Sequence, residues 1–224
     1  TLFAERRQER HRLAPGRRER GTADPPVIGI VHSSHQAICR QAIHQLRHIG
    51  SHAMAVLGDL AQRLLRFIGR QFEPGLIQEA WEDFTGETEP FDPKTPHIVV
   101  FMPWFFHHWY PSRAHTRFPD LAARKATVAS ELILQQRPRL DPLLVRYLEA
   151  CAAAAFSFHE AVRVEPGRGF LLRDLMLESE TFVIEHSASR SVHPWDMVFA
   201  QIVRIDGLAM LEGCGPLVFQ PREK

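Results

Sequence analysis

A chain of 224 residues, 45% of them apolar and 24% charged, is long enough to bury a substantial hydrophobic core. Its formal net charge of +1 is nearly neutral, so the overall charge excludes neither nucleic acid nor protein as a partner. No apolar run approaches the roughly 20 residues that cross a bilayer, so we expect neither a membrane segment nor a signal peptide. The three cysteines are isolated, which favours a reducing, cytoplasmic setting.

Residues 1–26 are rich in arginine, poor in apolar side chains, and end in Asp24-Pro25-Pro26. Because so few apolar groups cannot offset the entropy of ordering, the composition predicts a flexible basic arm. Two interpretations stay open, namely a solvated leader and an arm that contacts phosphate groups. The Arg- and His-rich composition up to about His52 also fits a misplaced start of translation.

Amphipathic spacing predicts a mainly helical domain over residues 27–156. Apolar residues recur at intervals of three and four in successive segments that begin near Gln36, Val56 and Ile77. The aromatic run at 97–110 is either a binding wall or the hydrophobic centre, and large apolar residues in series favour the centre. A further helix is predicted over 120–136. Another is predicted to start at Asp141-Pro142, since aspartate caps helices and proline fits the first helical position.

Residues 157–224 carry short apolar and β-branched runs, which predict strands. The predicted strands cover 162–165, 170–177, 181–186, 197–205 and 208–211, with turns at Pro166-Gly167 and Asp206-Gly207. Five short strands in about 60 residues suit a small half-open β-barrel of the SH3 or OB type. The predicted fold class is therefore α+β, with a basic arm, a helical domain and a C-terminal small barrel.

A set of short motifs lies between roughly residues 64 and 220: Phe84, Phe101-Met102-Pro103-Trp104-Phe105, Trp109, Leu140-Asp141-Pro142, Tyr147-Leu148-Glu149-Ala150, Val164-Glu165-Pro166-Gly167-Arg168-Gly169, Leu172-Arg173-Asp174-Leu175, Glu185-His186-Ser187-Ala188-Ser189 and Pro194-Trp195-Asp196. Together they resemble a group of uncharacterised bacterial proteins that often end in a SEC-C zinc motif. The resemblance supports the predicted architecture of helices followed by strands. It implies no function, because that family has no established activity. The zinc motif itself needs a C-terminal cysteine cluster, and only Cys214 lies in that region here, so no metal ligands carry over.

Histidines near the N-terminus suggest a metal site. His44 and His48 lie four residues apart on a predicted helix, a spacing at which two imidazoles can chelate zinc or another transition metal. The competing interpretation is a solvated helix face. A histidine-dependent metalloenzyme is therefore one functional hypothesis, although no catalytic motif accompanies these residues.

The predicted barrel offers a binding surface, for which we single out Arg173, Arg190 and Trp195. Arginines beside aromatic side chains are typical of nucleic-acid binding, but acidic residues are interleaved with them throughout the segment. The leading prediction is a non-enzymatic cytoplasmic interaction module with a protein partner. A nucleic-acid-binding small barrel is the first alternative, and the metalloenzyme is the second.

Overall fold

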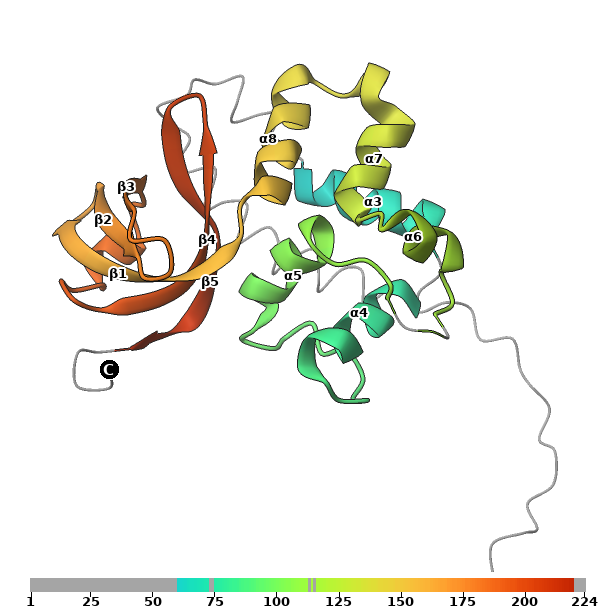
Figure 1. Cartoon of the computed structure of the whole chain (residues 1–224), viewed down its shortest axis with the longest axis horizontal. Coiled ribbons are helices and arrows are strands. Elements are labelled where there is room, and N and C mark those ends of the chain that lie inside the picture. The colour runs from blue at the N-terminus through green and yellow to red at the C-terminus, as the bar shows by residue number, and fades with distance from the viewer. Residues whose placement is uncertain (1–59, 73–74, 113, 115, 220–224) are drawn as a thin grey trace, which may run out of the picture.

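The computed structural model describes residues 60–72, 75–112, 114 and 116–219. Helices occupy the first part of this region and one antiparallel sheet the second, so the predicted α+β class is confirmed. Figure 1 shows the helices on one side of the molecule and the strands on the other, with the last helix leading directly into the first strand. Among the described residues, none of the helices has the length and apolar content needed to cross a membrane.

The first three described helices are α3 (Leu60–Gln71), α4 (Gly75–Thr85) and α5 (Ile98–His107). They pack around aromatic rings. Phe101 and Phe105 of α5 are fully buried and stack with their centroids 5.7 Å apart, while Trp81 of α4 meets Phe101 edge-on at 5.0 Å. The aromatic run therefore forms the hydrophobic centre of the helical part. The interpretation that the sequence favoured is confirmed.

The predicted continuous helix over 120–136 is wrong at its middle. Two helices occupy this segment, α6 (Pro119–Arg124) and α7 (Val128–Gln136). Lys125 adopts a left-handed conformation with φ of 49°, which ends α6. The Thr127 side chain then accepts a hydrogen bond from the backbone N–H of Ser130 at 3.2 Å and starts α7. The break lets Ala126 reach the core.

Helix α8 (Pro142–Ala153) follows a short 3₁₀ turn, η2 (Arg137–Arg139). The Asp141 carboxylate accepts a hydrogen bond from the N–H of Leu143 at 2.8 Å, and Pro142 occupies the first turn, so the predicted helix start is confirmed. One face of α8 is buried and consists of Leu144, Val145, Tyr147, Leu148 and Cys151. This face packs against the helical core.

Five strands follow, as predicted: β1 (Phe156–Glu165), β2 (Gly169–Asp174), β3 (Glu180–Ile184), β4 (Met197–Ile205) and β5 (Leu208–Phe219). A 3₁₀ turn, η3 (Ala188–Arg190), lies between β3 and β4. The chain turns between β1 and β2 at Gly167, and between β4 and β5 at Asp206 and Gly207, where φ is 48° and 80°. Both turn predictions are confirmed.

The sheet order is β3-β2-β1-β4-β5, with every neighbouring pair antiparallel. The strands do not form a closed barrel, because no ladder of hydrogen bonds joins β3 to β5 among the described residues. The two edge strands nevertheless approach each other, since the sheet is curled. Bulges in the β1–β2 and β4–β5 pairings accompany this curvature.

The hairpin of β4 and β5 belongs to two cores at once. Val203, Ile205 and Met210 point into the helical core, whereas Ile202 and Leu211 alternate with them and point into the concave side of the sheet. A strand period of two residues explains this division. The helices and the sheet are therefore joined by shared apolar packing.

The side chain of Gln201 fixes the end of α8 onto the sheet. Gln201 is fully buried on β4, and its amide nitrogen lies 2.8 Å from the carbonyl oxygens of Cys151 and Ala154 and from Nε2 of His108. The last carbonyls of a helix lack partners within the helix itself. One side chain therefore supplies hydrogen bonds to the end of α8 and connects that end to the residue after α5.

Replacing this amide tests its contribution to stability. We expect Gln201→Leu to lower the free energy of unfolding by about 1–3 kcal/mol, because it leaves buried carbonyl oxygens without a donor. Urea denaturation measures the change. Gln71→Leu, on an exposed position of α3, is the matched control and should change the same free energy by less than about 0.5 kcal/mol. Equal effects of the two substitutions would contradict the assigned role.

Candidate functional site

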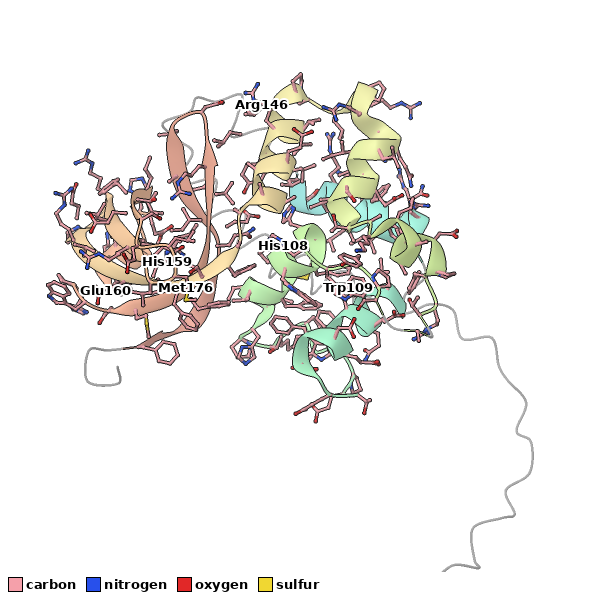
Figure 2. All side chains as sticks on the ribbon, viewed as in Figure 1. His108, Trp109, Arg146, His159, Glu160 and Met176 are labelled. Carbon is pink, nitrogen blue, oxygen red and sulfur yellow. The ribbon has the colours of Figure 1, made fainter. Side chains whose placement is uncertain are left out.

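A pocket of about 470 Å³ lies where the end of α8 meets the concave side of the sheet. Its apolar lining comes from alanines at the end of α8 and from Leu172, Met176, Leu177 and Ile202. Its polar lining comes from Ser157, His159, Asp174, Ser179, Thr181 and Arg204. In Figure 2 the labelled His159 and Met176 lie on the sheet side of the molecule, and His108 lies on the side of the helices. The combination of polar and apolar groups makes this pocket the main candidate site.

His159 lies on the inner face of β1, opposite Asp174 on β2 and Val198 on β4. Its side chain is only 4% exposed, and neither ring nitrogen has a hydrogen-bond partner of regular geometry among the described residues. Burial lowers the pKa of His159, and this effect outweighs the upward contributions of the Asp174 charge and the nearby Ala200 carbonyl. The Arg204 charge adds to the lowering. His159 is therefore a buried, neutral imidazole with free hydrogen-bonding capacity.

Asp174 shapes the loop beside the pocket. Its Oδ1 atom accepts hydrogen bonds from Ser157 Oγ at 2.8 Å and from the backbone N–H groups of Met176 and Leu177 at 2.8 and 3.1 Å. Burial alone would raise the pKa of Asp174, but these hydrogen bonds and the nearby His159 hold it below its ordinary value. The carboxylate therefore stays ionised and holds the loop in place.

The loop that Asp174 holds exposes two adjacent apolar side chains. Met176 and Leu177 are each 76% exposed, and Leu175 before them is also exposed. Arg204 of β4 reaches across the curled sheet and donates a hydrogen bond to Thr181 of β3. The pocket thus has an apolar edge and a row of hydrogen-bond donors side by side.

Ser157, Asp174 and His159 are the residue types of a hydrolytic triad, but their arrangement differs from one. In a triad the serine hydroxyl donates to histidine, and histidine donates to the carboxylate. Here the Ser157 hydroxyl donates to Asp174 directly, and no hydrogen bond joins Ser157 to His159 among the described residues. These three side chains therefore lack the hydrogen-bond pattern of a triad in the described part of the chain.

The predicted site residues lie apart from this pocket. Arg173 on β2 pairs with Glu180 at 2.8 Å and with Glu160 at 3.6 Å, and Arg190 lies in η3 beside Gly167. Trp195 is an exposed residue with φ of 74° in the loop before β4. No hydrogen bond or ion pair joins any two of the three in the described part of the chain. His44 and His48 lie outside the described residues.

We did not predict His159 or Asp174 as site residues from the sequence. The burial of His159 could have been predicted, whereas its pairing with Asp174 could not. The strand alternation around Ala161 places His159 on the buried face of β1, and this periodicity is readable from the sequence. The pairing of His159 with Asp174 depends on the register between β1 and β2. A bulge in that pairing makes the register unreadable from spacing alone.

A second polar cluster lies within the helical core and joins three elements. His107 at the end of α5, Cys151 of α8 and Glu212 of β5 are all buried, and their potential ligand atoms lie within 4.8 Å of one another. The Tyr147 hydroxyl donates a hydrogen bond to Glu212. Burial raises the pKa of Glu212 to about 7, and the hydrogen bond from Tyr147 opposes this shift.

No family model, curated protein or solved structure matches this chain.

The lowered pKa of His159 predicts a pH dependence of stability. The unfolded chain binds a proton at this imidazole at higher pH than the folded chain does, so the contribution of His159 to the free energy of unfolding should decrease as the pH falls below about 6.5. His108 contributes in the same direction, because burial also lowers its pKa despite an opposing hydrogen bond with Ala154. Glu212, whose pKa is raised to about 7, contributes in the opposite direction over the same range, so a comparison of variants isolates the effect of His159. We expect His159→Asn to lose less stability than the wild type between pH 7.5 and 5.5.

Urea denaturation at these two pH values measures the effect. The range stays above the region in which Asp174 takes up a proton. His97→Asn, at an exposed position before α5, is the control and should retain the pH dependence of the wild type. An unchanged pH dependence in His159→Asn would show that this imidazole is not held neutral by burial.

Proposed function

We propose that this chain is a non-enzymatic interaction module that binds a segment of a partner protein in the pocket between α8 and the sheet. The observation that carries the proposal is a combination within one pocket of about 470 Å³. It holds a buried imidazole whose nitrogens have no hydrogen-bond partner of regular geometry among the described residues, and two adjacent, strongly exposed apolar side chains. Pockets that bind ligands typically combine apolar walls with a few convergent polar groups.

The apolar edge supplies contact area for a partner. Fully burying one side chain the size of Met or Leu contributes roughly 1.5–3 kcal/mol, so Met176 and Leu177 together can supply a large part of a binding free energy. Methionine is also adaptable in shape, which suits a surface that receives a flexible segment. Asp174 holds the loop in place and so reduces the entropy lost on binding.

The polar lining indicates what the segment carries. Arg204, Ser179 and Thr181 offer donor groups, whereas the one acidic side chain among the lining residues, Asp174, already accepts three hydrogen bonds. A carboxylate complements this arrangement, since it only accepts hydrogen bonds and carries the charge opposite to that of Arg204. The proposed ligand is therefore a peptide with an acidic group next to an apolar side chain.

Two broader expectations belong to the same proposal. The five antiparallel strands curl so that β3 lies close to β5. This curl supports a relationship to SH3-like or OB-like barrels, although the sheet itself is open. The three isolated cysteines support a cytoplasmic setting. The likeness to bacterial proteins that often carry a SEC-C motif also stays a proposal, and several residues behind it, including Phe101 and Tyr147, are buried in the helical core.

A peptide library with free and amidated C-termini tests the proposed partner chemistry on the full chain. We expect the enriched peptides to contain Asp, Glu or a free C-terminal carboxylate adjacent to an apolar residue. Arg204→Gln and the double substitution Met176→Ser with Leu177→Ser should each weaken binding of such a peptide at least about tenfold, or about 1.4 kcal/mol. Isothermal titration calorimetry measures the change.

Leu134→Ser is the matched control, because Leu134 is an equally exposed leucine on α7, away from the pocket. It should leave peptide affinity unchanged. A peptide affinity that the pocket substitutions leave unchanged would contradict the proposal. So would a dimer of the chain that the Met176 and Leu177 substitutions abolish, because the apolar edge would then serve self-association.

Nucleic-acid binding is a second candidate, favoured by a row of aromatic rings on the outer face of the sheet. Phe156 stacks on Phe199 with centroids 5.5 Å apart, and Phe158 lies 5.0 Å from Phe199 and 6.5 Å from Phe219. Such rings can stack with unpaired bases. The neighbouring charges, however, are ion pairs between Arg173 and two glutamates, which leaves little positive field beside the row.

Fluorescence anisotropy with labelled single-stranded DNA and RNA oligonucleotides at low salt tests this candidate. If the row binds bases, Phe158→Ala should cost about 1–3 kcal/mol of binding free energy, as expected for the loss of one stacking platform. Trp195→Ala serves as the aromatic control outside the row. Absence of binding at low salt, or greater sensitivity to Trp195 than to Phe158, would exclude this use of the row.

A further inference from the structure

The buried cluster of His107, Cys151 and Glu212 presents three different metal-ligating atoms in one place. The three side chains come from α5, α8 and β5, and their exposed fractions are 3%, 0% and 5%. An imidazole nitrogen, a thiol sulfur and a carboxylate oxygen are the donor types that zinc accepts in proteins. Chance proximity of exposed acidic residues does not account for this set, because all three side chains are inside the core.

The separation of the donor atoms suits a single ion. Three atoms that lie within 4.8 Å of one another share a point no farther than about 2.8 Å from each, whereas zinc bonds to N, O and S measure about 2.0 to 2.3 Å. A contraction of about 0.5 to 0.8 Å per donor therefore brings all three to bonding distance.

Charge complements this geometry. A thiolate and a carboxylate carry two negative charges between them, and a neutral imidazole adds none. Burial of those two charges alone among apolar side chains would be costly. A divalent cation neutralises them, so the loaded cluster would have no net charge in the core.

Neighbouring side chains hold the donors in place. Tyr147 donates a hydrogen bond to Glu212, which orients the carboxylate. The backbone carbonyl of Cys151 accepts a hydrogen bond from Gln201 at 2.8 Å, which fixes the end of α8. The pocket described above is lined by none of the three ligands.

We propose that His107, Cys151 and Glu212 bind one divalent transition-metal ion of the zinc type, and that this ion ties α5 and α8 to β5. The role is structural, since the three donors are buried and none of them lines the pocket. Binding to the folded state alone stabilises a protein by mass action. The metal would therefore hold the helices against the sheet at the same junction where Gln201 acts.

Cobalt substitution in the full chain tests this site, because a thiolate bound to Co²⁺ gives an intense near-ultraviolet charge-transfer band. The other two cysteines are removed first by Cys39→Ser and Cys214→Ala, so that any such band reports Cys151. We expect one Co²⁺ per chain, a charge-transfer band, and its displacement by Zn²⁺. His44→Gln with His48→Gln should leave the band unchanged, which separates this site from binding by the N-terminal histidines.

Glu212→Gln preserves the size of the side chain and its ability to accept from Tyr147, so it is the variant most suited to retain the fold. It should weaken Zn²⁺ binding at least about tenfold in competition with a chromophoric chelator. Cys151→Ser in the same background should abolish the charge-transfer band. Absence of the band in the parent protein, or a melting temperature that Zn²⁺ and chelators leave unchanged, would overturn the proposal and identify the cluster as a metal-free polar contact.

Discussion

The buried amide of Gln201 is the contact on which the relation between the helices and the sheet depends. It lies on β4, yet its nitrogen is within 2.8 Å of acceptors on α8 and of His108 after α5. The end of a helix leaves carbonyl groups without internal partners, and a sheet residue satisfies them here. Apolar packing around the β4–β5 hairpin is not directional, whereas this amide specifies where α8 ends over the sheet.

The same strands serve different purposes on their two faces. On the face toward the helices, β4 and β5 contribute Val203, Met210 and Glu212 to the core, beside Tyr147 and Cys151. On the concave face, His159 and Ile202 line the pocket. Both faces carry buried polar groups. Those toward the helices belong to our structural metal proposal, and those on the concave face belong to our proposal for partner binding.

Local chemistry explains which elements were predictable. Asp141-Pro142 and Asp206-Gly207 act within a few residues, through a side-chain cap and through positive φ angles, so the sequence showed both correctly. The helix over 120–136 was predicted as continuous because its apolar spacing continues through the break. Lys125 in a left-handed conformation ends α6, and no glycine or proline marks the position. The aromatic run was predicted to be core, and the structure adds that most of it forms helix α5, with Pro103 inside the helix.

The sequence by itself determined that helices precede strands, and it determined the β4–β5 hairpin and the aromatic centre, because each arises from neighbours in the chain. Tertiary structure alone decided the two candidate sites. His159 meets Asp174 only through strand register, and His107, Cys151 and Glu212 meet only because α5 and α8 pack against β5. Arg173, which we singled out from the sequence as a binding residue, is paired with glutamates on adjacent strands. Contacts between residues distant in the chain depend on packing and register, and local spacing does not encode either.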